Sequence, residues 1–282
     1  MAGNIADKDL IQSLSWLRKL LPLCILIVVA NLIALAVFLK RSLLVKKSTY
    51  LLVNLTIADL LVGFSGVILE VLWKIFPSLE YTYMHMIYGG FVVFSTSSSI
   101  LTLAVISVER VIAVFWPFHH RLAKRWHFLT TIGFVWLLSV VAGITYSFFC
   151  RAISNKRLSA EVNYSIISVA SLSTILASYL SIWIKMTFFT KFRRSRTIQE
   201  NSKLTKTLFI VTLVSLGTWM PRTVADIVLL LEVDTIVSKI EVYQVVYIVF
   251  LSNSFLNLAV YLFKMPEFTK ELRNLCICGK CT

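Results

Sequence analysis

Residues 49–74 read TYLLVNLTIADLLVGFSGVILEVLWK, an apolar stretch in which Asp59 is the only charged residue before Glu70. A helix rises about 1.5 Å per residue, so a helix of this length crosses a hydrocarbon core of roughly 30 Å. A helix also pairs its own backbone groups, and the strict alternation of polar and apolar residues that a membrane β-barrel requires is absent here. The stretch therefore predicts a membrane-spanning helix.

The whole chain has the composition of a membrane protein. Of its 282 residues 58% are hydrophobic and 15% are charged, whereas soluble domains average about 25% charged residues. Apolar stretches joined by short connections fill nearly the whole length, which leaves no room for a separate soluble domain. We expect an all-α integral membrane bundle of seven transmembrane helices, at residues 17–40, 49–74, 84–116, 127–149, 164–190, 203–231 and 242–263. Residues 1–16 would form a short extracellular N-terminus, residues 17–263 the membrane domain, and residues 264–282 a short amphipathic eighth helix with a cytoplasmic tail.

The distribution of the basic residues predicts the orientation. The net charge is +14, and the cations lie in short loops between the spans. With the N-terminus outside, Lys and Arg on the inner side outnumber those on the outer side roughly two to one, as the positive-inside rule requires. This predicts a multi-pass membrane protein with a cytoplasmic C-terminus. Membrane lipids are expected partners, and nucleic acid is not, because no soluble basic face is present.

Two sequence features predict covalent modification. Asn163-Tyr164-Ser165 is a glycosylation sequon, expected in the second outer loop. Three cysteines follow the amphipathic stretch 266–275, where palmitoylation from the cytosol and unmodified thiols both remain open. They are Cys276, Cys278 and Cys281.

Polar residues within the spans point to a functional interior. Burying a charge in a membrane costs roughly 2.5–3.5 kcal/mol on insertion scales, so such residues should face inward and meet one another. The segments that carry them are NLTIADLL (54–61), ISVERVIAVFWPF (106–118), TWMP (218–221) and NLAVYLFKMPEF (257–268). In order and spacing these segments resemble the signatures of the rhodopsin-like (class A) G-protein-coupled receptors. Asn31, Trp136 and Tyr179 occupy single landmarks of the same family.

The resemblance implies an allosteric sodium ion and no other cofactor. Oxygen ligands suit a small hard cation, and a buried carboxylate needs a cation or a proton. The ion would be held mainly by Asp59 and Ser99, and a hydrogen-bonded network around a protonated Asp59 is the alternative. The pocket implied by the resemblance consists of Asp59, Ser99, Trp219, Asn253, Ser254 and Asn257.

The resemblance also implies a switch that couples to a heterotrimeric G protein. Arg110 would pair with Glu109 at rest and, once released, present its guanidinium to the G protein and to Tyr179. Pro221 would form a hinge below Trp219, and Tyr261 would swing toward Arg110. An acid at the base of helix six would complete an ionic lock, but the register points equally to Glu200 and Asn201, so a full lock is not expected.

Several departures from the family pattern bear on the ligand. His85 stands where helix three usually has a disulfide-forming cysteine, which leaves Cys150 without its usual partner, and Ser171 and Leu258 replace the prolines of helices five and seven. Loss of the disulfide and of the helix-five proline resembles the melanocortin, cannabinoid and lysophospholipid branch. Val92 and Leu251 argue against an amine receptor and a retinal opsin, respectively.

The ligand is expected between the outer halves of the helices. Small-molecule, lipid and peptide ligands all remain open. Arg222 and Asp226, four residues apart, would either pair with each other or leave Arg222 to meet an anionic or zwitterionic ligand group. The residues expected to line the pocket are Glu70, Val92, Ser95, Thr96, Arg222 and Asp226, with His85 at its rim.

The resemblance predicts a receptor that transmits a signal and is not an enzyme. No H-E-x-x-H, G-x-S-x-G or phosphate-binding glycine loop is present in the sequence. A membrane transporter or channel is the alternative function, and it would require a continuous polar path across the bilayer.

Overall fold

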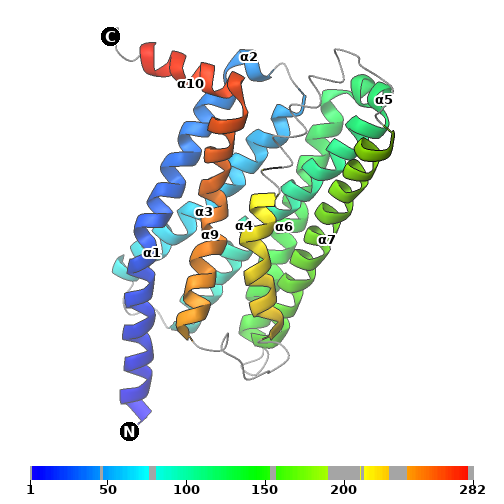
Figure 1. The fold of residues 1–282 in the computed structure, drawn as a ribbon. Helices are drawn as coiled ribbons and strands as arrows, with labels where there is room; N and C mark the ends of the chain where they lie inside the picture. The colour runs from blue at the N-terminus through cyan, green and yellow to red at the C-terminus, as the bar shows by residue number, and fades with distance from the viewer. Residues whose placement is uncertain are drawn as a thin grey trace.

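The computed structural model describes residues 2–44, 47–75, 81–152, 157–189, 210, 213–228 and 240–278, and these residues form a bundle of long helices (Figure 1). The N-terminus and the C-terminus lie at opposite ends of the bundle. A further helical segment, 213–228, is drawn in yellow in Figure 1 and packs against α9. The helices are α1 (Ala2–Phe38), α2 (Arg41–Leu44), α3 (Thr49–Ile75), α4 (Tyr81–Phe115), α5 (Pro117–Leu122), α6 (Arg125–Ala152), α7 (Arg157–Phe189), α9 (Ile240–Lys264) and α10 (Pro266–Cys278).

Six of these helices are long and apolar enough to cross a membrane. The segments concerned are Leu20–Phe38, Thr49–Ile68, Met86–Phe115, Arg125–Phe149, Tyr164–Lys185 and Val242–Lys264. They coincide with six of the seven predicted spans to within a few residues at most ends. Much of the remaining span, predicted at 203–231, falls outside the described residues, although 213–228 is helical as expected. Residues 2–16, predicted to precede the first span, continue α1 as helix.

Two long helices end, and short helices begin, at prolines on the side of the bundle that carries α10. We call this side the α10 end. Pro117 begins α5 directly after α4, and Pro266 begins α10 directly after α9. Proline disfavours helical geometry in the residue before it but suits the first position of a new helix. In α10 the side chain of Phe268 is fully buried and packs against Phe38 of α1. The predicted amphipathic helix thus lies across the bundle end (Figure 1).

Close helix packing depends on small residues. α4 is central and contacts α3, α6 and α7. A Cβ atom added to Gly143 of α6 would lie 2.7 Å from the carbonyl oxygen of Gly90 in α4. In a membrane, where helices gain little from burying apolar surface against one another, close backbone approach of this kind favours association.

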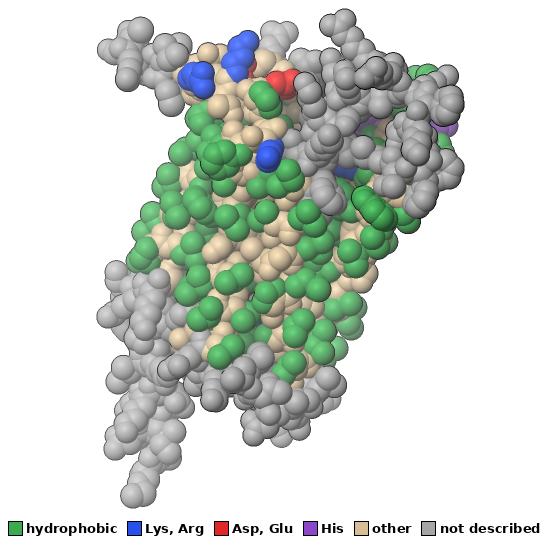
Figure 2. Space-filling view, in the orientation of Figure 1, with side chains coloured by type: hydrophobic (Ala, Val, Ile, Leu, Met, Phe, Trp, Pro, Cys, Tyr) green, Lys and Arg blue, Asp and Glu red, His purple; other side chains and the backbone are tan. Residues whose placement is uncertain are grey.

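The outer surface of the bundle is apolar. Figure 2 shows hydrophobic side chains over the middle of the visible face, while Lys, Arg, Asp and Glu side chains gather toward the α10 end. Apolar side chains such as Leu32, Phe134 and Trp183 are exposed on this surface, as expected for contact with acyl chains. Inside, two apolar clusters lie on either side of a layer of buried polar residues.

Candidate functional site

The interior polar layer is centred on Asp59, whose side chain is fully buried. Oδ1 accepts hydrogen bonds from the hydroxyls of Ser99 (2.8 Å) and Ser254 (2.9 Å), and Oδ2 accepts one from Nδ2 of Asn257 (2.7 Å). We call these four residues the central polar cluster. None of the three donors carries a positive charge, so the carboxyl group needs a cation or a proton to be stable at this depth.

The oxygen atoms of the central polar cluster fit a small cation. Besides the carboxylate, the cluster offers the hydroxyl oxygens of Ser99 and Ser254 and the amide oxygen of Asn257. That amide oxygen is buried and has no hydrogen-bond partner among the described residues. Small hard cations prefer oxygen ligands of these types. Within the described part of the chain, no group of three or more His, Cys, Asp and Glu residues is placed to hold a metal ion.

The other two residues predicted for this pocket, Asn253 and Trp219, have neighbours other than Asp59. Asn253 accepts a hydrogen bond from the hydroxyl of Thr218 (3.2 Å) on segment 213–228. Trp219 is buried and packs edge-to-face on Phe250, with ring centroids 4.7 Å apart. Asn31 of α1 donates to the carbonyl oxygen of Ser254 (3.0 Å). Among the described residues, Trp219 and Asn253 therefore make no hydrogen bond to Asp59.

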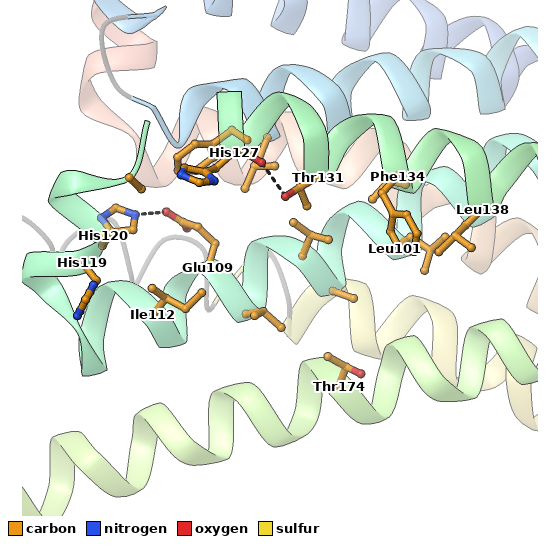
Figure 3. A pocket seen from close by; sticks show the side chains of 17 residues that line it. Leu101, Glu109, Ile112, His119, His120, His127, Thr131, Phe134, Leu138 and Thr174 are labelled. Carbon is orange, nitrogen blue, oxygen red and sulfur yellow. Dashed lines mark hydrogen bonds and ion pairs between the residues drawn. The ribbon is translucent and has the colours of Figure 1, made fainter. Parts of the chain in front are cut away.

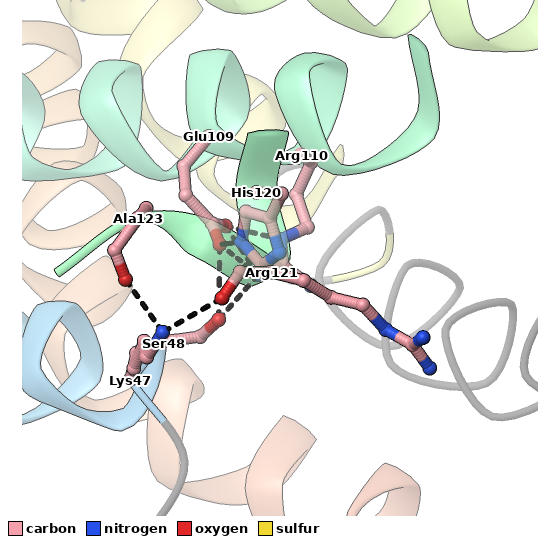
Figure 4. A network of polar contacts seen from close by, with 7 residues as sticks. All are labelled: Lys47, Ser48, Glu109, Arg110, His120, Arg121 and Ala123. Atoms are coloured by element: carbon pink, nitrogen blue, oxygen red, sulfur yellow. Dashed lines mark hydrogen bonds and ion pairs between the residues drawn. The ribbon is translucent and has the colours of Figure 1, made fainter. Parts of the chain in front are cut away.

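At the α10 end, Arg110 is buried within a network of polar contacts (Figure 4). Its guanidinium pairs with Glu109 and donates a hydrogen bond to the hydroxyl of Ser48 (2.7 Å), which in turn donates to Oε1 of Glu109 (2.9 Å). Nε2 of His120 lies 2.5 Å from the same carboxylate oxygen. We call Ser48, Glu109, Arg110 and His120 the arginine network.

Two members of the arginine network could not be found from motif spacing. Ser48 directly precedes α3 and His120 lies in α5, so both contacts depend on how the connections fold back against α4. Lys47 holds this arrangement together by donating to the carbonyl oxygens of Arg121 (2.9 Å) and Ala123 (2.5 Å) (Figure 4).

The remaining switch residues that the structure describes lie on α9, α7 and segment 213–228. Tyr261 is almost fully buried, and its ring packs between Phe38 and Phe268 at centroid distances of 5.1 and 5.8 Å. Its hydroxyl has no hydrogen-bond partner among the described residues. Tyr179 is buried in the apolar cluster nearer the α10 end, and Pro221 is exposed on segment 213–228. Glu200 and Asn201 lie outside the described residues.

The opposite half of the bundle holds a second group of buried polar side chains. Nε of Arg222 donates to Oδ2 of Asp226 (2.9 Å), and the guanidinium carbon lies 4.8 Å from the ring centroid of Tyr243. The i, i+4 pairing predicted as one alternative is therefore formed. Tyr164 lies within electrostatic range of both Arg222 and Asp226.

Three hydroxyls of α7 in this region were missed by sequence reasoning. Tyr164, Ser165 and Ser168 are buried, and the Tyr164 hydroxyl lies near the side chains of Thr96 and Ser168 without a well-formed hydrogen bond to either. Their i, i+1 and i+4 spacing on an apolar helix was the signal that could have revealed them. We call these three residues, together with Arg222 and Asp226, the outer polar cluster. Of the other predicted lining residues, Ser95 and Thr96 are buried and donate to the carbonyl oxygen of Val92 in their own helix.

The structure does not describe the side chains at the remaining predicted positions. The side chains of Glu70, His85 and Cys150 lie outside the described residues. Asn163 was expected in a loop but lies inside α7, which begins at Arg157. The helix extends outward because Leu158, Ala160 and Glu161 are good helix formers. Cys276 and Cys278 end α10, their side chains are not described, and Cys281 lies beyond the described residues.

Comparisons with known proteins agree with this geometry. The family model "7 transmembrane receptor (rhodopsin family)" matches residues 30–261. Over 125 residues the chain is 32% identical to neuromedin-U receptor 2 of Homo sapiens, an alignment that covers 43% of this chain and 30% of that receptor. The chain thus matches about 30% of the length of this curated relative. The all-α bundle of seven transmembrane helices predicted from the sequence is confirmed by the family match. By its name the relative is not a melanocortin, cannabinoid or lysophospholipid receptor, so membership of that branch stays a prediction.

Proposed function

Because this chain belongs to the rhodopsin family of seven-transmembrane receptors, we propose that it binds an extracellular ligand and activates heterotrimeric G proteins at its α10 end. The family match favours this function over the transporter or channel alternative. The family is one of signalling receptors, and we propose accordingly that the chain catalyses no covalent chemistry of its own.

The observation that carries the proposal is the arginine network. Arg110 is 3% exposed, and its charge is compensated by Glu109 and by the hydroxyl of Ser48. Leaving a buried guanidinium unpaired would be costly, so Arg110 becomes available only when the bundle opens at this end. The network therefore suits a two-state switch whose active state is stabilised by a bound partner.

The chain is a multi-pass plasma-membrane protein, and we propose that its α10 end faces the cytoplasm. Basic residues at that end include Lys40, Lys47, Arg121, Lys124 and Arg125. An excess of Lys and Arg in short loops marks the cytoplasmic side of a membrane protein. Palmitoylation of Cys276, Cys278 and Cys281 would fit this orientation, as would glycosylation of Asn163 on the other side.

We propose the outer polar cluster as the ligand site. Arg222 and Asp226 compensate each other, so the cluster carries no uncompensated charge, while the buried hydroxyls of Tyr164, Ser165 and Ser168 make no well-formed hydrogen bonds among the described residues and supply donors and acceptors for a ligand. Buried polar groups without partners cost free energy until they are satisfied. A ligand with a neutral or zwitterionic hydrogen-bonding group matches this chemistry.

The central polar cluster would connect the two ends of the receptor. We propose that a sodium ion at Asp59 and Ser99 stabilises the resting state, and that its loss accompanies activation. The support is the set of buried oxygen atoms and the unpartnered amide oxygen of Asn257. Because α3, α4 and α9 all contribute to this cluster, a change there alters how these helices pack.

A test of the proposed function does not require the ligand. Cells expressing the wild type, Arg110→Ala or Arg121→Ala would be assayed with dissociation sensors for each G-protein class. Arg121 is the matched control because its side chain is exposed at the same end of the bundle and points away from the arginine network (Figure 4). We expect basal signal in at least one class that Arg110→Ala removes and Arg121→Ala retains, at equal surface expression. Coupling to no class, or signal that survives Arg110→Ala, would contradict the proposal.

A further inference from the structure

A pocket lies on the flank of the bundle near the α10 end. Of the residues in the polar clusters described above, only Glu109 and His120 of the arginine network also line this pocket. It has a volume of about 410 Å³ and runs between α4, α6 and α7 (Figure 3). Its wall is mainly apolar, with Val105, Val108 and Ile112 from α4 and Phe134 and Leu138 from α6. We call it the flank groove.

The flank groove opens toward the lipid. Val108, Ile112, Phe134 and Leu138 line it and are each between 39% and 60% exposed on the outside of the bundle. All four lie within the membrane-spanning segments of α4 and α6. An opening at this depth meets acyl chains rather than water, so the occupant that fits these walls is a hydrocarbon chain supplied by the bilayer.

One end of the flank groove is polar and basic. His119, His120 and His127 line it there, as Figure 3 shows, and Phe134 and Leu138 lie toward the other end. The stretch 119–127 also contains Arg121, Lys124 and Arg125, all with exposed side chains. The acidic residue in the lining, Glu109, is already compensated by Arg110. The first turn of α6, which begins at Arg125, adds the positive end of a helix dipole.

We propose that the flank groove binds an anionic phospholipid, with one acyl chain between α4 and α6 and its phosphate beside His119, His127 and Arg125. Several cations spread over α5, the short connection after it and the start of α6 suit a phosphate headgroup better than a single fatty-acid carboxylate, and an uncharged sterol would leave them without a partner. Basic pockets between helices on the cytoplasmic side of a membrane are suited to anionic headgroups. The assignment to the cytoplasmic leaflet rests on the proposed function, whereas the lipid chemistry does not.

The flank groove is adjacent to the proposed switch. His120 belongs to its lining and contacts Glu109, which pairs with Arg110. A phosphate beside α5 would favour one position of this short helix, and α5 in turn contributes a partner to Glu109. Binding of the lipid is therefore expected to change the stability of the arginine network, which makes the membrane composition a regulator of coupling.

The test uses the full chain, purified from membranes and incorporated into nanodiscs of phosphatidylcholine with one-fifth phosphatidylglycerol. Lipids retained after transfer to detergent would be counted by native mass spectrometry. Val108→Trp blocks the apolar part of the flank groove, and Leu138→Trp blocks it from the other wall if the first variant fails to fold. Val141→Trp, at a lipid-facing position of α6 outside the lining, is the matched control. The headgroup is tested with His119→Gln plus Arg125→Gln, and its control is Lys270→Gln plus Arg273→Gln on α10.

We expect the wild type and both controls to retain one phosphatidylglycerol in preference to phosphatidylcholine. The tryptophan variants should lose that lipid. The headgroup variant should lose the preference by roughly fivefold or more, since a cation at a membrane surface contributes about 1 kcal/mol toward an anionic lipid. Equal retention in wild type and groove variants would overturn the proposal, as would retention of added oleic acid or cholesterol instead of phosphatidylglycerol. The count needs no G protein, so its outcome is independent of the coupling assay, and coupling without retained lipid would leave the receptor function standing alone.

Discussion

Nδ2 of Asn257 donates a 2.7 Å hydrogen bond to Oδ2 of Asp59 and so joins α9 to α3 in the interior of the bundle. The two residues are 198 positions apart in the sequence. The same carboxylate accepts from Ser99 of α4 and from Ser254 of α9, so three helices meet at one buried acid. Any event that changes the charge of Asp59 must change how these helices pack, because all three donors are oriented toward it.

The first prediction concerns sodium at Asp59. We expect the melting temperature of the purified receptor to be higher in sodium chloride than in choline chloride at the same ionic strength. A ligand present at ten times its Kd stabilises the state that binds it by about 1.4 kcal/mol. Asp59→Asn and Ser99→Ala should each remove most of the sodium dependence, because each removes an oxygen ligand of the proposed ion.

Ser107→Ala is the matched control for the sodium measurement. Ser107 is a buried serine of α4, the helix that also carries Ser99. Its hydroxyl donates to the carbonyl oxygen of Ala104 (2.7 Å) rather than to Asp59. Its sodium dependence should equal that of the wild type. A wild-type receptor whose melting temperature is the same in both salts would favour the alternative, a hydrogen-bonded network around a protonated Asp59.

The interior of the bundle could be predicted from the sequence because burial cost and helical spacing are local properties. A carboxylate such as Asp59 within an apolar stretch must face inward, and the signature around Asn257 placed its partner. The contacts of Ser48 and His120 could not be predicted, because they depend on how the residues before α3 and those of α5 fold back against α4. The buried hydroxyl of Tyr164 was missed for a related reason: an aromatic residue at the edge of a span is commonly an interfacial anchor.

A second prediction concerns the hydrogen bonds that link α3, α4 and α6. Nε1 of Trp136 donates to Oδ1 of Asn54 (2.8 Å), and Nδ2 of Asn54 donates to the hydroxyl of Thr102 (2.8 Å). Asn54→Ala removes both bonds. Interhelical hydrogen bonds in membrane proteins average about 0.6 kcal/mol, so we expect a loss of roughly 1 kcal/mol of unfolding free energy.

A double-mutant cycle with Asn54→Ala and Trp136→Phe would isolate the bond between these two residues. The coupling energy, measured by unfolding in mixed micelles, should be positive and within about 0.3–1 kcal/mol. Thr56→Ala serves as a control, because the hydroxyl of Thr56 bonds within its own helix to the carbonyl oxygen of Leu52. Additive effects of Asn54→Ala and Trp136→Phe would show that the bond makes no net contribution.

The third prediction tests the close approach of α4 and α6. In Gly143→Ala the new Cβ would lie 2.7 Å from the carbonyl oxygen of Gly90 and 2.9 Å from Cβ of Phe94, so the helices must separate. Overpacking of this kind costs about 1–3 kcal/mol, and the melting temperature should fall by several degrees. Gly133→Ala on the same helix has no atom within 4 Å of the new Cβ and should be neutral or stabilising by up to about 1 kcal/mol. Equal melting temperatures for the two variants would refute the role of Gly143 in helix packing.

The last prediction concerns Ser48, which joins both charges of the arginine network. Its hydroxyl accepts from Arg110 and donates to Glu109, so Ser48→Ala leaves each charged group with one partner fewer. The loss should destabilise the resting state by about 0.5–1 kcal/mol and raise basal G-protein signal roughly two- to fivefold. Ser42→Ala is the control, because the Ser42 hydroxyl bonds to Glu271 of α10 on the exposed side of the same connection. The G-protein sensors described above, read at matched surface expression, provide the measurement. If Ser48→Ala leaves the basal signal unchanged or lowers it, the Ser48 hydroxyl does not hold Arg110 in its resting position.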